Sequence, residues 1–360
     1  MKVAYIVRST LFTVIGGDTH QVVNTAALIR QLGTEVVILP ANQRIDYNRY
    51  TLLHFFNLTR PADILPHIGH LTMPYVISPI LVNYSLFDKT YRGGIIGRIS
   101  RHLPQNTIEY LKVVARWLNR TDRSISAAYL LKGQQKSIEL ILKKCAFLLP
   151  NSMLEQNALR QQYKVRNQFA IVPNGVSPAL FKPEQDAVKD PNLVLCVARI
   201  EGIKNQLNLI KAINNSSYRL LLIGDPAPNQ QAYYNNCKEI AGPNITFIDH
   251  LPQAELIKYY QQATVHVLPS WFETCGLSSL EAAAMGCNIV ITDKGYTREY
   301  FEDYAFYCDP NSPDSIRNAI HLAATAPAPA ALQEKIITHY TWHKAAEKTL
   351  FAYRQVLNIT

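Results

Sequence analysis

The sequence predicts an α/β protein with two doubly wound parallel sheets, one in each half of the chain. Three observations predict this fold class. Short apolar segments typical of buried strands alternate with amphipathic helical segments. The alternation stops at 173–191, a linker rich in Pro, Asn, Asp and Gly, and then begins again. The length of 360 residues suits about two domains.

The first half opens with an apolar strand at 3–7, which is followed by Gly16 and Gly17. A helical pattern then runs from about 19 to 32, and Gly33 ends it. The rhythm is broken between 80 and 145 and resumes afterwards. In this half we expect further strands at 34–39, 52–56, 75–77, 147–149 and 169–172, and further helices at 107–118, 124–144 and 153–163.

The second half repeats strand and helix in regular order. We read 326–331 as a loop, because its two prolines interrupt the helical pattern. The expected strands are 193–197, 219–223, 245–248, 265–268 and 288–291, and the expected helices are 204–213, 229–240, 253–262, 278–285, 312–323 and 342–357.

The composition is that of an ordinary globular protein, with 48% hydrophobic and 18% charged residues. No run of 18 apolar residues occurs, so the sequence predicts no spanning helix. The first seven residues suit a buried strand better than a signal peptide, and we expect a cytoplasmic protein. The six cysteines show no Cys-x-x-Cys spacing and read as small buried hydrophobes in a reducing compartment: Cys145, Cys196, Cys237, Cys275, Cys287 and Cys308.

The net charge of +9 comes from one segment, 89–144, which holds 12 Lys and Arg against 3 Asp and Glu. Its helix from about Thr107 carries a basic side, and a basic amphipathic helix can lie on an anionic membrane surface. The alternative is a core-packed helix with a solvated basic side. The residues concerned are the apolar Ile108, Leu111, Val114, Ala115 and Leu118, the basic Lys112, Arg116 and Arg120, and nearby Tyr91, Arg92, Arg98, Arg101 and Trp117.

The segment 269–286 carries the strongest chemical signal in the chain. Glu273 and Glu281 stand eight residues apart, on either side of a turn between a strand and a helix that starts near Ser278. Backbone N–H groups at a helix start attract anions, and glycine at 276 lets backbone approach a ligand. A phosphate on these amides, with two carboxylates that accept hydroxyl hydrogen bonds, describes a sugar nucleotide. In the alternative, Glu273 is a loop carboxylate and Glu281 forms a capping box with Ser278.

Arg199 and Lys204 follow the expected strand at 193–197 and open a helix. Ligands of doubly wound sheets bind at the carboxyl ends of the strands, where this loop lies. Arg offers a planar fork and Lys a point charge, and both suit a diphosphate. The alternative is a solvated surface pair.

Together these motifs resemble the family-4 retaining glycosyltransferases of glycosyltransferase group 1. The spacing of Glu273 and Glu281 is similar to the family's Glu-x7-Glu signature, 172–183 to its "PNGV…F.P" crossover, and 197–204 to its Arg…Lys pair. The resemblance implies the GT-B fold, with two Rossmann-like domains facing a cleft and a C-terminal helix that returns to the N-terminal domain. The implied domains are 1–175 on the acceptor side, with a basic helical insert at about 85–145; 185–340 for the nucleotide sugar; and 341–360 as the returning helix.

The resemblance also implies roles for single residues. Glu281 would accept hydrogen bonds from the ribose hydroxyls, and Glu273 would contact the transferred sugar. Glu273, Arg199 and Lys204 form the expected catalytic set. Backbone amides would contact the phosphate or sugar of the donor at Thr274, Cys275, Gly276 and Leu277, and the diphosphate from the opposite wall at Gly16 and Gly17.

Three further polar residues matter for the acceptor side. His54 resembles the histidine of a family stretch after the third strand, and it either lines the cleft or is a buried, hydrogen-bonded histidine. Ser78 and Asn83 occur where the family often has a histidine after the fourth strand. We assign no general base to Asp18 or His20.

The implied reaction moves a hexose, with retention, from a UDP- or GDP-type sugar to a hydroxyl of a saccharide or lipid-linked glycan. Such a reaction serves cell-surface polysaccharide or glycolipid synthesis, with the protein peripheral at the inner membrane face through 89–144. The sequence has no Asp-x-Asp pair, so we expect neither a metal nor a cofactor. The alternatives are a GT-B sugar-nucleotide epimerase, a non-catalytic sugar-nucleotide binding protein, and a nucleic-acid binding protein suggested by the pI of about 9.1. No nucleic-acid recognition module is recognisable, and nucleic acid is not an expected partner.

Overall fold

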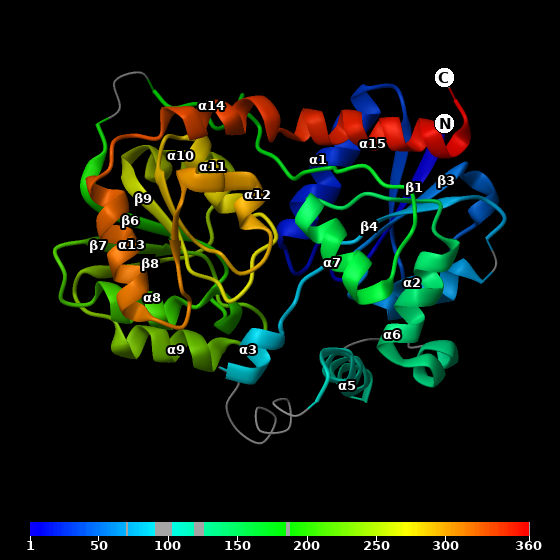
Figure 1. The fold of residues 1–360 in the computed structure, drawn as a ribbon, viewed down its shortest axis with the longest axis horizontal. Helices are drawn as coiled ribbons and strands as arrows, with labels where there is room; N and C mark the ends of the chain where they lie inside the picture. Colours follow the sequence, from blue (N-terminus) through cyan, green and yellow to red (C-terminus); the bar gives the residue numbers. More distant parts are fainter. Residues whose placement is uncertain (70, 91–102, 119–125, 185–187, 360) are drawn as a thin grey trace. The chain divides into compact units, whose positions relative to one another are not determined.

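The computed structural model describes residues 1–69, 71–90, 103–118, 126–184 and 188–359 (Figure 1). The chain divides into two compact units. Unit 1 comprises Met1–Asn174 together with Trp342–Thr360, and unit 2 comprises Gly175–Thr341. The predicted α/β class with two parallel sheets is confirmed.

The described part of unit 1 contains a parallel five-stranded sheet in the order β2-β1-β3-β4-β5. The first strand therefore lies between the second and the third, and the direction of winding reverses beside it. Ligands of open α/β sheets bind at such a switch point. The strands are β1 (Lys2–Val7), β2 (Glu35–Pro40), β3 (Leu52–Phe56), β4 (Tyr75–Ser78) and β5 (Phe147–Leu148).

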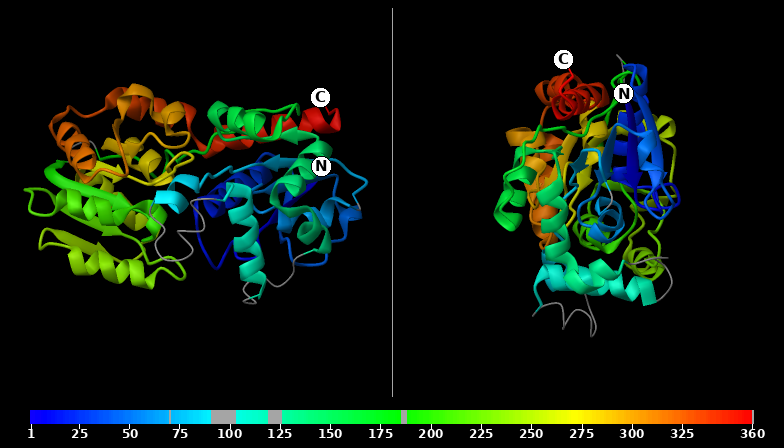
Figure 2. Two further views of the ribbon diagram at one scale, coloured as in Figure 1. Left: turned by 60° about the horizontal axis from the view of Figure 1, so that its bottom comes forward. Right: turned by 90° about the vertical axis from the view of Figure 1, so that its right-hand side faces the viewer.

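The helices of unit 1 include one from the far end of the chain. Helix α15 (Trp342–Leu357) packs against α1 (Gly17–Gln31), and Figures 1 and 2 show the C-terminal helix beside the N-terminal segments. Ala345, Ala346 and Tyr353 are among its buried residues. The remaining described helices are α2 (Pro61–Ile68), α3 (Ser85–Thr90), α5 (Gln105–Leu118), α6 (Ala127–Lys144) and α7 (Met153–Tyr163), with the short turn η1 (Tyr47–Arg49).

Unit 2 contains a parallel six-stranded sheet in the order β11-β10-β9-β6-β7-β8. Its first strand, β6 (Asp190–Val197), lies between β7 (Arg219–Ile223) and β9 (Ala263–Leu268). This is the strand order of dinucleotide-binding sheets, with the switch point between β6 and β9. The other strands are β8 (Ile245–Ile248), β10 (Asn288–Thr292) and β11 (Phe306–Cys308).

Seven α-helices and two short turns of the described chain complete unit 2. The apolar core joins strand residues such as Leu195 and Leu268 to helix residues such as Leu280 and Ile336. The helices are α8 (Gln206–Ile213), α9 (Gln231–Ile240), α10 (Gln253–Gln262), α11 (Leu277–Ala284), α12 (Thr297–Phe301), α13 (Pro313–Thr325) and α14 (Ala330–His339), with η2 (Gly202–Lys204) and η3 (Glu302–Tyr304).

Several elements differ from the sequence prediction. The expected strand at 169–172 is a single bridge, in which Phe169 pairs with Leu148. Helices α2, α3, α12 and α14 and strand β11 were not predicted. The loop expected at 326–331 ends early, because α14 begins at Ala330, immediately after Pro329. A proline next to a helix start is compatible with the helix, since the first N–H groups have no partner inside it.

The insert also differs from its prediction. On α5 the buried apolar residues are Ile108 and Val113, whereas Leu111 and Leu118 are 47% and 67% exposed. The alternative of a core-packed helix is therefore contradicted at Leu111 and Leu118. Lys112, expected on a basic side, pairs with Asp88 at 2.8 Å and with Glu109 at 2.7 Å. Tyr91, Arg92, Arg98, Arg101 and Arg120 lie outside the described residues.

Two composition-based expectations can be set beside the structure. All six cysteines are buried. Among the helices that the structure describes, none is both long enough and apolar enough to span a bilayer.

Candidate functional site

The predicted site residues of unit 2 lie on loops at one edge of its sheet. Arg199 and Lys204 follow β6, and Glu273 follows β9, the neighbouring strand. Because the carboxyl ends of parallel strands meet at the same edge, the two loops flank the switch point. Glu281 lies on α11, the helix that follows the Glu273 loop.

Lys204 and Glu273 form a direct ion pair between Lys204 Nζ and Glu273 Oε1. The same carboxylate oxygen accepts a hydrogen bond from Ser270 Oγ at 2.7 Å. Glu273 is buried and Lys204 is partly exposed. The sequence predicted both residues at the site but not their pairing, because they are 69 residues apart.

The backbone of Glu273 is fixed by the loop after β10. Glu273 N–H donates to the Lys294 carbonyl at 3.0 Å, and Tyr296 N–H donates to the Glu273 carbonyl at 2.9 Å. Gly295 has φ +117°, and a Cβ there would lie 2.0 Å from the Glu273 carbonyl oxygen. Gly295 is therefore required by this close approach. Sequence reasoning missed it, although a glycine just after a strand is the relevant signal.

Arg199 stands on a similarly fixed backbone. Gln206 Nε2 donates to the Arg199 carbonyl at 2.9 Å. Gly224, at φ +144°, allows the close approach of Ala198, whose carbonyl oxygen would lie 2.2 Å from an added Cβ. The Arg199 guanidinium pairs with Glu201 at 2.9 Å, and its side chain is 39% exposed. The guanidinium group of Arg199 thus remains accessible to a further anion.

Glu281 is buried, and both of its carboxylate oxygens accept hydrogen bonds. Gln253 Nε2 donates to Oε1 at 2.6 Å, and Tyr260 Oη donates to Oε2 at 2.9 Å. Burial raises the pKa of Glu281 to about 7, although the two hydrogen bonds oppose this shift. The alternative of a capping box with Ser278 was wrong, since the N-cap of α11 is Gly276 and Glu281 is bonded to α10.

The start of α11 presents backbone N–H groups, as the sequence predicted. Gly276 has φ +69°, and an added Cβ would lie 3.0 Å from Ile291 Cδ1 in the core. Core packing and the positive φ therefore demand this glycine, whatever approaches from outside. The side chain of Cys275 is buried in the core cluster, while Thr274 and Leu277 are half-buried. A contact between the nucleotide sugar and Cys275 would thus involve only the backbone of this residue.

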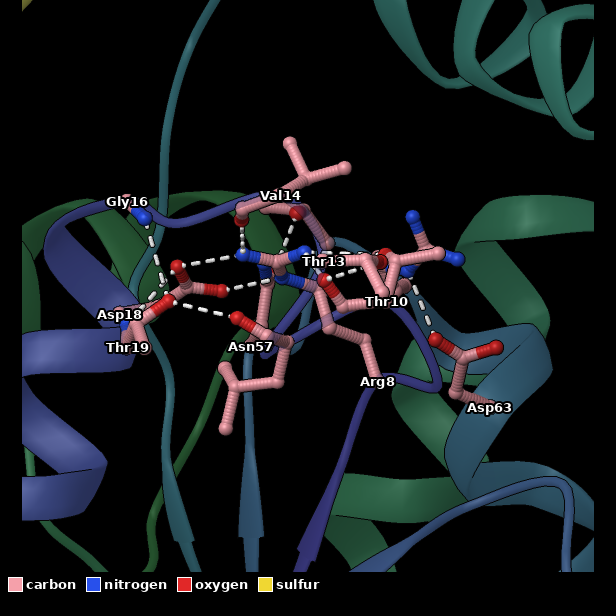
Figure 3. Close-up of polar contacts among 12 residues, drawn as sticks. Arg8, Thr10, Thr13, Val14, Gly16, Asp18, Thr19, Asn57 and Asp63 are labelled. Carbon is pink, nitrogen blue, oxygen red and sulfur yellow. Dashed lines mark hydrogen bonds and ion pairs between the residues drawn. The ribbon is translucent and has the colours of Figure 1, made fainter. Parts of the chain in front are cut away.

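In unit 1, Arg8 organises the loop between β1 and α1 (Figure 3). It donates to both carboxylate oxygens of Asp18, at 2.6 and 2.9 Å, and to the carbonyls of Thr10 and Val14, at 2.8 and 2.7 Å. Asp18 is thereby committed to a structural role. Gly16 N–H donates to Thr19 Oγ1 at 3.1 Å. Sequence reasoning missed Arg8, whose signal is a charged residue directly after the first strand.

Gly17 is the first residue of α1, two positions earlier than the helix start expected from the sequence. The donor contacts predicted for Gly16 and Gly17 stay predictions. No three His, Cys, Asp or Glu side chains gather as a metal site within the described ranges. The expected independence of a metal likewise stays a prediction.

His54 is a buried, hydrogen-bonded histidine. Its Nδ1 lies 2.6 Å from Tyr353 Oη, and its Nε2 lies 2.9 Å from Ser78 Oγ. Burial lowers the pKa of His54 to about 3, so the ring is neutral. Ser78 is buried in the same contact, and Asn83 Oδ1 accepts the Ser85 N–H at 2.9 Å. His54 and Ser78 thus join β3, β4 and α15.

Comparison with known proteins bears on the family and the fold. Residues 179–339 match the family "Glycosyl transferases group 1". A D-inositol 3-phosphate glycosyltransferase of Acidothermus cellulolyticus is 24% identical over 238 residues, which are 58% of this chain and 53% of the relative. The corresponding protein of a Nocardioides species is 22% identical over 60% of this chain and 55% of its own length. The matches thus span about half the length of these curated relatives.

Solved structures show the same fold over the whole chain. A sucrose-phosphate synthase of Thermosynechococcus elongatus has a TM-score of 0.73 at 17% identity and covers 100% of both chains. The Anabaena HepE protein, solved in complex with UDP, has a TM-score of 0.71 at 14% identity and covers 99% of this chain and 100% of its own. The chain therefore has the fold of the GT-B glycosyltransferases, and most of its second unit matches the model of the glycosyltransferase group 1 family.

Proposed function

We propose that this protein is a retaining glycosyltransferase that moves a hexose from a nucleoside-diphosphate sugar to a saccharide or lipid-linked glycan. One observation carries the proposal. The switch point of unit 2 is flanked by Arg199 and the Lys204–Glu273 pair, with Glu281 on the adjoining helix, in a domain of glycosyltransferase group 1. Anabaena HepE has been solved with UDP and with UDP-glucose, which favours a UDP sugar as the first donor to test.

The charges of the site suit the departure of a diphosphate. As the bond from the anomeric carbon to the diphosphate breaks, negative charge grows on the phosphate oxygen and positive charge on the sugar. Arg199, Lys204 and the N-terminus of α11 compensate the phosphate charge, which makes a divalent cation dispensable. Glu273 contacts the transferred sugar, and Glu281 accepts hydrogen bonds from the ribose hydroxyls.

Retention requires no protein nucleophile in this proposal. The acceptor hydroxyl attacks the anomeric carbon on the face from which the diphosphate departs. A new bond forms between the acceptor oxygen and the anomeric carbon, and the hydroxyl proton passes to the departing phosphate oxygen. The acceptor belongs to cell-surface polysaccharide or glycolipid synthesis.

The test of the donor site is thermal unfolding with UDP, GDP, ADP and dTDP, each with and without EDTA. A ligand that binds only the native state raises the unfolding midpoint. We expect a rise with one nucleotide that persists in EDTA and is lost in Arg199→Ala. Arg219→Ala is the matched control, because Arg219 lies at the opposite end of a strand of the same sheet. No rise with any nucleotide would contradict the proposal.

Product analysis separates transfer from epimerisation. The donor sugar that gives the largest rise in midpoint is incubated with the protein, first alone and then with oligosaccharide acceptors. A changed sugar nucleotide in the absence of acceptor indicates an epimerase. A new glycosidic bond whose anomeric configuration matches the donor, read by proton NMR, supports retaining transfer.

The exposed apolar residues of the insert favour a second contact, with an anionic membrane surface. On α5, the exposed Leu118 follows the exposed Trp117, and on α6, Leu131, which is 88% exposed, precedes the exposed Lys132. Such side chains suit insertion at a lipid interface beside basic residues. We expect flotation with phosphatidylserine vesicles at low salt, weakened in the double variant Trp117→Ser, Leu118→Ser. Recovery in the soluble fraction at every salt level would refute the contact.

A further inference from the structure

Two side chains of α10 hold the buried carboxylate of Glu281 from one helix face. Gln253 is the first residue of α10, and Tyr260 follows seven positions later. Residues seven apart lie on the same side of a helix, separated by about 10 Å along its axis. Side chains also tilt toward the helix N-terminus, so the long Tyr260 side chain reaches back toward Gln253. Their polar ends meet at the two oxygens of one carboxylate.

This arrangement restricts Glu281 strongly. A carboxylate on a helix has several rotamers, and an unpaired one would sample them. Here Oε1 accepts from Gln253 at 2.6 Å and Oε2 accepts from Tyr260 at 2.9 Å, so a change of rotamer breaks both bonds. Each carboxylate oxygen has two lone pairs, which leaves one acceptor position on each oxygen for another donor. Two adjacent hydroxyl groups suit two such positions on one carboxylate.

We propose that Tyr260 and Gln253 are positioning residues that orient the Glu281 carboxylate for the paired 2′- and 3′-hydroxyls of the donor ribose. This inference rests on the proposed function, because it assumes that a nucleotide binds unit 2. Tyr260 is fully buried, so its effect on a bound nucleotide passes through Glu281. A tyrosine that only satisfied its own buried hydroxyl would affect all ligands equally.

The experiment compares two ligands on four proteins. The dissociation constants of UDP and of 2′,3′-dideoxy-UDP are measured by calorimetry for the wild type, Tyr260→Phe, Gln253→Ala and the control Tyr259→Phe. Tyr259 is the neighbouring tyrosine on the same helix, whereas the tyrosine hydroxyl that donates to Glu281 is that of Tyr260. If the protein binds GDP and not UDP, GDP and 2′,3′-dideoxy-GDP replace the two uridine ligands.

We expect the wild type to prefer UDP over the dideoxy analogue. At pH 8, above the pKa of Glu281, Tyr260→Phe should raise the dissociation constant of UDP about tenfold, the usual loss for a hydrogen bond to a charged group. The dissociation constant of the dideoxy analogue should change by less than about twofold. Gln253→Ala should act in the same direction, and Tyr259→Phe should leave both constants unchanged. In a protein that already carries Glu281→Gln, the further change Tyr260→Phe should not alter the dissociation constant of UDP, because the carboxylate that Tyr260 positions is absent.

Any of four results would overturn the inference. Equal losses of both ligands in Tyr260→Phe and Gln253→Ala would mean a general structural effect, and unchanged constants would mean no positioning. If the wild type discriminates and both variants discriminate equally well, only the positioning role fails. If the wild type binds no nucleoside diphosphate, the proposed function is wrong, and this inference, which depends on it, is wrong too. Should Tyr260→Phe not fold, Gln253→Ala decides, since Gln253 is only half-buried at the helix start.

Discussion

At the scale of single residues, the ion pair between Lys204 and Glu273 couples two charged groups of the candidate site. Glu273 is buried with two donors, Lys204 Nζ and Ser270 Oγ. We expect Lys204→Ala to destabilise the protein by about 1–3 kcal/mol, because the buried carboxylate loses its charged partner. In a double-mutant cycle with Glu273→Gln, the two losses should be less than additive. Urea denaturation measures all four proteins, with the exposed Lys211→Ala as the control. Additive losses would mean that the pair is not coupled.

Glu281 makes stability depend on pH in the direction opposite to most carboxylates. Its pKa is raised from 4.5 to about 7 by burial, so the folded state binds a proton that the unfolded state releases. The stability from this neutral carboxyl is fully present below pH 4.5 and is lost as pH rises through about 7. The free energy of unfolding of Glu281→Gln, relative to that of the wild type, should therefore rise by about 1–3 kcal/mol between pH 5 and pH 8. Denaturation at both pH values tests this, with Glu255→Gln on α10 as the control. The same difference at both pH values would contradict it.

The elements show where sequence reasoning succeeds and where it cannot. Strands such as β6 and β9 contain short apolar runs, so their positions along the chain could be predicted, and with them the loops that carry Arg199, Lys204 and Glu273. Tyr260 and Gln253 could not be assigned to Glu281, because their contact depends on how α10 packs against α11. Helix α14 was missed because Pro327 and Pro329 dominated the local pattern. On α5, apolar spacing alone did not distinguish the buried Val113 from the exposed Leu118.

Helix α15 is attached to unit 1 by buried polar contacts of Tyr353 with His54 and Tyr5, as well as by apolar packing. Tyr353 Oη lies 2.6 Å from His54 Nδ1, and its ring is fully buried. Tyr353→Phe leaves the histidine nitrogen without that partner, which should destabilise unit 1 by about 1–3 kcal/mol. Hydrogen exchange of the native protein should show reduced amide protection in β3 and α15. The amides of β6 and β9 should keep their protection. Tyr304→Phe, at an exposed position, is the control. Uniform loss of protection in both units would refute a local role.

At the scale of the whole molecule, the chain order and the folding units do not coincide. Unit 2 is one continuous segment, Gly175–Thr341, whereas unit 1 needs both Met1–Asn174 and Trp342–Thr360. Ala345, Thr349 and Tyr353 of α15 are buried, and α15 packs on α1. An N-terminal fragment without α15 would expose the apolar surface that this helix covers. Hydrophobic burial is the main favourable term in folding, so the fragment should be incompletely folded.

Dissection of the chain tests this directly. Residues 175–341 alone should unfold in one cooperative transition, because their sheet and core are complete in the segment. Residues 1–174 alone should bind the dye ANS and lack a cooperative transition, and a peptide of residues 342–360 added in trans should restore it. A peptide with Tyr353→Ala and Leu350→Ala is the matched control, since it removes two buried side chains of α15. Cooperative unfolding of 1–174 without peptide, at the stability of the full chain, would show that α15 is not needed to complete unit 1.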